Sequence, residues 1–268
     1  MKARPAPIDF SAAKPWWTPK HPPVGHGLNG GSVNLPYLEP YLIKIMKQAR
    51  KELETKAPEL IPDVDVFIQQ EANHFATHAR FNAVLREKYD GMEALEDEIR
   101  RDFEGFMERD LRWNLAYSEG FESMGLVQSE LFFEQIDDLL EEADPAVLEL
   151  WRWHLAEEFE HRCVCHDVYH ALYGRGIRSW WFRISVFVYA VRHLQGFGQK
   201  VARHLLAQDA AAGRLPTGWR HGLRSRLRGL RMRLFTLPRF FQVLMPWYTP
   251  RRRGELPPAE RFLAAMEA

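Results

Sequence analysis

Two Glu-x-x-His motifs constrain this sequence more than any other feature. Glu71 and His74 form the first motif, and Glu158 and His161 form the second. Residues three apart lie on one face of a helix, and apolar neighbours surround both motifs. Buried charged side chains need compensation, which a metal ion provides. The two motifs together therefore predict a metal site inside a helical protein.

The rest of the pattern is also helical. We expect helices over residues 37–56, 63–89, 92–143 with a break near Asp110, and 146–174, followed by further helices in the tail. Asp144 is the expected N-cap of the fourth helix, with proline at its first position. Because no segment alternates apolar and polar residues as a strand does, the sequence predicts the all-α class.

Composition divides the chain into three parts, for which we predict different structures. Residues 1–35 are rich in proline and glycine and are expected to form an irregular arm, residues 36–174 a metal-binding helical bundle, and residues 175–268 a basic, aromatic-rich helical extension. The 36 basic and 36 acidic residues balance overall, but residues 171–268 hold 18 basic and only 4 acidic ones. The neutral total therefore hides a strongly basic tail.

The location is predicted from what the sequence lacks. The N-terminal residues contain no apolar core of the length that a signal peptide needs. Cys163 and Cys165 are two apart on one expected helix, where their side chains diverge, so we expect no disulfide between them. We therefore expect a cytoplasmic protein.

A dinuclear site in a helical bundle takes Glu-x-x-His from two helices and one Glu from each of two others. Glu39 is the candidate on the first helix. On the third, Glu119 and Glu122 share a face, and we prefer Glu122. His78 and His154 lie on the same faces as the two motifs and are further candidates. The predicted metal-site residues are thus Glu39, Glu71, His74, His78, Glu122, His154, Glu158 and His161.

Two segments, QQEANHFATHARFN and WHLAEEFEHRCVCHDVY, with the single-Glu helix between them, resemble a bacterial family of predicted metal-dependent hydrolases. The resemblance extends over about Leu35 to Gly174. It implies a ferritin-like four-helix bundle, here with additional C-terminal helices, and it implies metal-site roles for the same residues other than Glu39. Family members commonly open the first helix with a proline-glycine-glutamate turn, whereas this chain has LPYLEPYL.

We expect two metal ions, and two reactions fit the same ligands. Carboxylate-rich dinuclear sites favour iron and dioxygen, so we rank first a di-iron enzyme that oxidises an unidentified, apolar organic substrate. The alternative is a metal-dependent hydrolase, with zinc or manganese as further candidate metals, in which one ion activates water and the other polarises the substrate.

The basic tail supports a second hypothesis. Segments such as LRSRLRGLRMRLFTLPRFF interleave arginine with leucine and phenylalanine, which suits peripheral contact with an anionic membrane at its cytoplasmic face and a small-molecule or lipid substrate. The competing interpretation is that these stripes close the bundle or form a homodimer interface. No recognised motif accompanies the basic stretch, so we expect no nucleic-acid partner.

Overall fold

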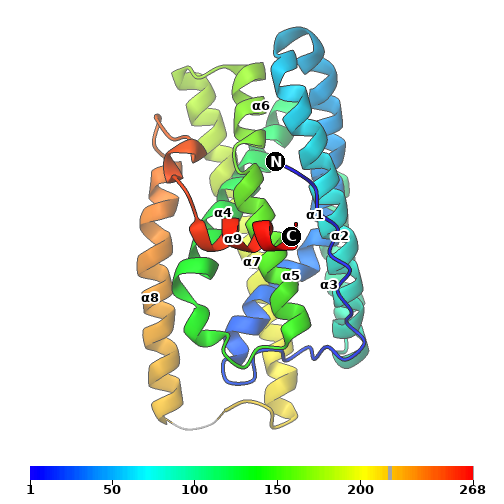
Figure 1. Cartoon of the computed structure of the whole chain (residues 1–268), viewed down its shortest axis with the longest axis vertical. Helices are drawn as coiled ribbons and strands as arrows, with labels where there is room; N and C mark the ends of the chain where they lie inside the picture. Colours follow the sequence, from blue (N-terminus) through cyan, green and yellow to red (C-terminus); the bar gives the residue numbers. More distant parts are fainter. Residues whose placement is uncertain (217–218, 268) are drawn as a thin grey trace.

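The computed structural model describes residues 1–216 and 219–267 and contains only helices and connecting segments in those ranges (Figure 1). The all-α class is therefore confirmed. The ferritin-like arrangement stays a prediction. The α-helices are α1 (Pro22–Lys56), α2 (Ile61–Lys88), α3 (Met92–Phe106), α4 (Leu111–Gln135), α5 (Pro145–His161), α6 (Val164–Tyr173), α7 (Ile177–Ala211), α8 (Trp219–Val243) and α9 (Pro257–Met266). Short 3-10 turns occur at Pro58–Leu60, Asp137–Leu139 and Pro250–Arg253.

The helix starts follow local chemistry. The Asp110 carboxylate accepts a hydrogen bond from the Trp113 amide and caps α4, which confirms the predicted break near Asp110. The Asp144 carboxylate likewise caps α5 by accepting from the amides of residues 146 and 147, and Pro145 occupies the first turn. Both caps satisfy amides that the helix itself leaves unpaired.

Helix α1 starts earlier than we predicted. Residues 22–35, expected to belong to the irregular arm, are helical from Pro22 onward. The prediction was wrong because glycine disfavours isolated helices, whereas here it permits close packing. A Cβ at Gly30 would lie 2.3 Å from the carbonyl oxygen of Gly198 in α7. Tertiary contact between α1 and α7 thus overrides local propensity.

The predicted fourth helix is also divided. It is interrupted at residues 162–163, so α5 ends at His161 and α6 begins at Val164. Gly174, with φ of 75°, ends α6 as predicted.

Four helices surround the candidate site. Helix α1 packs on α2, α2 on α5, and α5 on α4, while α7 covers the seam between α1 and α4. Large buried side chains such as Leu38, Tyr117 and Trp153 fill the space between these helices. Helix α8 packs along α4 at the edge of the molecule, away from α2 and α3 (Figure 1). Within the described ranges, no helix is long and apolar enough to cross a membrane.

Candidate metal centre

Seven of the eight predicted ligands come together in two buried groups. Side-chain atoms within each group lie within 4.8 Å of one another. The first group joins one residue of α1, one of α2 and two of α5: Glu39, His74, His154 and Glu158. The second joins one residue each from α2, α4 and α5: Glu71, Glu122 and His161.

Glu158 links the two groups. Its Oε1 atom lies 3.7 Å from His74 Nδ1 and 3.7 Å from His154 Nε2 in the first group, and 3.4 Å from His161 Nε2 in the second. Gly125 of α4 makes room for this carboxylate, because a Cβ at that position would stand 2.4 Å from Glu158 Oε2. Glycine at position 125 is therefore required for the observed position of the Glu158 carboxylate.

The polar atoms that face the two groups are buried without hydrogen-bond partners in the described part of the chain. Such atoms are rare in folded proteins, because each forfeits its interaction with water. They comprise both carboxylate oxygens of Glu39, Glu71, Glu122 and Glu158, Nδ1 of His74 and His154, and Nε2 of His161. Eight carboxylate oxygens and three imidazole nitrogens form a donor set that suits divalent metal ions, so the residues present fit such ions.

The site's electrostatics favour the same conclusion. Burial, and then repulsion from neighbouring carboxylates, raises the pKa values of Glu39 and Glu71 well above their usual range. Burial, and then Glu158, raises the pKa of Glu122 to about 7. Burial opposes ionisation of Glu158 too, but His161 and the other imidazoles outweigh it and lower its pKa to about 2. Divalent cations would relieve this crowding of acidic groups.

Hydrogen bonds behind the imidazoles fix their orientation. His74 Nε2 pairs with Glu157 Oε2 at 3.1 Å, which leaves Nδ1 toward the first group. His161 Nδ1 pairs with Gln70 Oε1 at 3.0 Å, which leaves Nε2 toward the second. Partners of this kind set the tautomer of a metal-binding histidine and its ring direction.

Arg4, in the N-terminal segment, holds Glu157 in place. Its backbone amide and its Nη1 donate to Glu157 Oε1 at 3.0 and 3.3 Å. The same guanidinium donates to Glu160 Oε2 at 3.0 Å and to Glu267 Oε1 at 2.7 Å, so it also joins α5 to the end of α9. The guanidinium of Arg4 thus compensates the charge of the buried Glu157 carboxylate beside His74.

Two candidates lie outside the groups. His78 Nδ1 bonds to Ser32 at 2.8 Å, and its ring lies next to that of His154, with centroids 4.8 Å apart. Glu119, the alternative to Glu122, instead pairs with Arg183 at 3.0 Å and with His166 at 3.2 Å. It is therefore Glu122 that points into the cluster.

The sequence reasoning missed Gln70 and Arg4, and it left Glu157 between a solvent-exposed and a supporting role. Gln70 and Glu157 each directly precede a motif residue, Glu71 and Glu158, but a helical period turns them off the ligand face. Only packing against the neighbouring helix shows that both are fully buried.

A cavity of about 230 Å³ reaches the centre from the α7 side. His154 and Glu158 lie in its wall, together with apolar side chains of four helices, among them Leu35, Phe121, Trp151 and Leu194. A substrate in this cavity would meet the first group.

The fold and these two groups define a class: all-α proteins with a buried, carboxylate-rich centre able to hold two metal ions. The comparison with family models is specific. Residues 2–254 match the model described as predicted metal-dependent hydrolase, and the chain belongs to that family. No curated protein and no solved structure matches the chain.

Proposed function

We propose that this protein is a hydrolase in which the two buried groups hold two divalent metal ions. The observation that carries the proposal is the set of buried carboxylate oxygens and imidazole nitrogens around Glu158 that have no hydrogen-bond partner in the described part of the chain. Family membership supports hydrolysis, which we ranked second from the sequence, over oxidation. When bound, two such ions polarise a substrate oxygen and lower the pKa of water.

The protein's own residues orient the imidazoles of the site and enclose the space for a substrate. Glu157 and Gln70 hold His74 and His161 in the tautomers that direct a nitrogen at the ions. The cavity wall of Phe121, Trp151 and neighbouring apolar side chains would hold the apolar part of an organic substrate beside His154 and Glu158. We therefore propose an ester or related compound with an apolar portion as the substrate.

A second candidate, dioxygen-dependent oxidation with iron, is favoured by one observation. Four carboxylates and two Glu-x-x-His histidines are the donor set of the di-iron helical bundles. The identity of the bound metal and its response to dioxygen distinguish the two functions.

The test begins with metal content in protein purified without added metal. We expect close to two equivalents per chain, and Glu158→Ala should lose at least one. Hydrolysis of p-nitrophenyl esters of increasing acyl length by zinc- or manganese-loaded protein supports the proposal if it disappears with a chelator. Iron, with a new absorption band when Fe(II)-loaded protein meets air and no hydrolysis, would favour oxidation. Absence of stoichiometric metal would refute both functions.

A further inference from the structure

Helix α8 exposes a continuous apolar stripe. Its members are spaced three and four residues apart, so they lie on one face of the helix. Each is between 51% and 64% exposed: Leu223, Leu227, Leu230, Leu234, Leu237 and Phe241. The helix packs on α4 with its other side, where Met232 is partly buried. The stripe thus faces away from the bundle, which argues against the interpretation that it closes the bundle.

Arginines flank this stripe on both sides. At 100° per residue, Arg224 and Arg231 lie along one edge of the stripe, and Arg226 and Arg233 along the other. Arg231 pairs with Asp138 at 2.9 Å. The other three make no ion pair within residues 1–216 and 219–267, and the sequence of α8 contains no acidic residue. The exposed face is therefore apolar at its centre and cationic at its edges.

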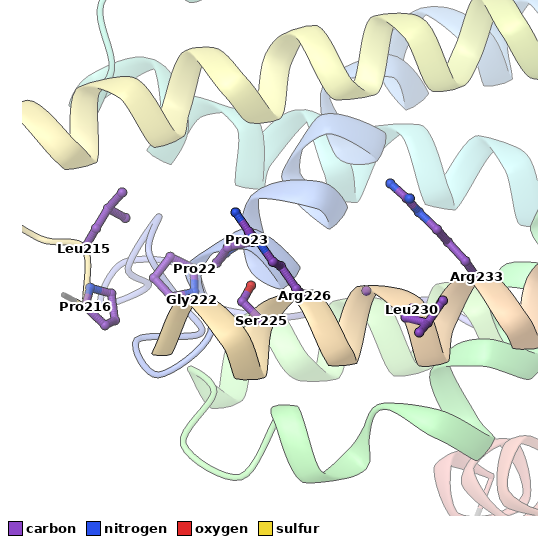
Figure 2. A pocket seen from close by; sticks show the side chains of 10 residues that line it. Pro22, Pro23, Leu215, Pro216, Gly222, Ser225, Arg226, Leu230 and Arg233 are labelled. Carbon is purple, nitrogen blue, oxygen red and sulfur yellow. The ribbon is translucent and has the colours of Figure 1, made fainter. Parts of the chain in front are cut away.

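Apolar grooves run along the Arg226 and Arg233 edge. One, of about 390 Å³, lies between α7 and α8 and is lined by apolar side chains together with Arg192 and Arg233. Another, of about 620 Å³, lies where α8 passes the start of α1 (Figure 2). Figure 2 shows Arg226 and Arg233 extending from α8 over the space between α8 and α7. Each groove offers apolar walls beside a guanidinium.

A further cavity beneath α8 lies between these grooves and the cavity at the metal centre. This cavity, of about 480 Å³, shares Thr236 and Phe240 with the first groove and Gly229 with the second. It also shares Met124 and Gln128 with the cavity that His154 and Glu158 line. Neighbouring hollows therefore follow one another from the outer face of α8 to the candidate site.

We propose that α8 docks on an anionic lipid bilayer and that the site acts on a lipid-like amphiphile taken from it. In this arrangement the leucine stripe enters the acyl boundary while the flanking arginines bind lipid phosphates. Trp181 and Trp247, each over 60% exposed, extend the contact near the end of α8, where the Trp180 indole donates to Leu244 O. The charge of α8 favours a bilayer over a second copy of this chain as the partner. A dimer formed through the two stripes would bring the like-charged arginine rows of both copies together.

The test is sedimentation of the full chain with vesicles. We expect binding to phosphatidylglycerol-containing vesicles that weakens as salt rises, and little binding to phosphatidylcholine alone. Leu227→Glu/Leu234→Glu should reduce the partition coefficient at least about tenfold, since it places two charges in the stripe. Both side chains are exposed, so we expect the variant to fold. Ala76→Glu/Ala94→Glu, on α2 and α3 at the opposite side of the molecule, adds the same charge and should bind like the parent (Figure 1).

The outcomes separate this proposal from the proposed function, on which its substrate part rests. Equal vesicle binding by the parent and the stripe variant would overturn docking. Docking would also be overturned if the only effect of the stripe substitutions were to convert a dimer into a monomer in analytical ultracentrifugation. Glu158→Ala should bind vesicles normally, because binding does not use the metal centre. If docking holds, hydrolysis of long-chain over short-chain esters supports the substrate class, and a preference for short chains contradicts it.

Discussion

Gly125→Ala should weaken metal binding without harming the fold. The added Cβ would lie 2.4 Å from Glu158 Oε2, whereas ordinary contact begins near 3.4 Å. The carboxylate must therefore move by about 1 Å, which exceeds the roughly 0.5 Å within which a site has to be held. We expect a loss of about 10- to 100-fold in affinity for at least one ion, the range seen when the support of a metal ligand is disturbed.

Stability should change little, because two effects oppose each other. Alanine is more favourable than glycine inside a helix by about 1 kcal/mol, which offsets part of the steric cost. Titration of metal-free protein with Zn²⁺ or Mn²⁺ against a chromophoric chelator measures the affinity, and thermal unfolding checks the fold. Gly196→Ala in α7 is the matched control, since no atom of residues 1–216 or 219–267 outside its own helix turn lies within 4 Å of a Cβ there.

A double-mutant cycle makes the test sharper. Once Glu158→Ala has removed the carboxylate, Gly125→Ala should have no further effect on metal binding. Full stoichiometry and unchanged affinity in the single variant would refute the reasoning that Glu158 binds metal in the observed position. If Gly125→Ala lowered metal affinity equally in the parent and in Glu158→Ala, the substitution at Gly125 would act through a residue other than Glu158.

Three other perturbations test the surroundings of the site. Glu157→Gln should lower metal affinity about tenfold in the same titration while keeping stoichiometry, because it weakens the support of His74. Burial opposes ionisation of Glu119, but Arg183 and His166 lower its pKa to about 2. Since the folded-state value lies below the ordinary 4.5, its stabilisation is complete above pH 4.5 and is lost as pH falls toward 2. Glu119→Gln should thus be less stable by about 3 kcal/mol in urea unfolding at pH 7, and the difference should shrink in acid. Gly30→Ala should lower the unfolding free energy by roughly 1–3 kcal/mol, because its Cβ would meet the α7 backbone; an unchanged melting temperature would contradict this.

Helical periodicity explains how much of the site could be predicted. Glu71 with His74, and Glu158 with His161, share a face by spacing alone, so their convergence follows once each helix faces the core. The same reasoning found Glu39 and limited the choice on the third expected helix to Glu119 and Glu122. It could not decide against Glu119, because that residue shares the face and is drawn elsewhere by Arg183, which is distant in sequence.

What the sequence could not predict depends on contacts between distant segments. The early start of α1 rests on the approach of Gly30 to Gly198, and propensity alone argues against a helix there. The support of His74 by Glu157 and Arg4 likewise joins three separate parts of the chain. Periodicity reports which face of a helix is buried, but not what the opposite helix supplies.

Arg4 has a consequence for the order in which the molecule is assembled. Its guanidinium joins Glu157, which orients His74, to Glu267, which follows α9. The hydrogen bonds from Arg4 to Glu157 and Glu160 can form as soon as α5 has been synthesised, whereas the bond to Glu267 forms only after α9 has left the ribosome. The N-terminal segment is therefore held at α5 first and fixed to the end of α9 last. We expect a chain stalled before α9 to keep the support of His74 but to release its N-terminal segment from α5 more readily.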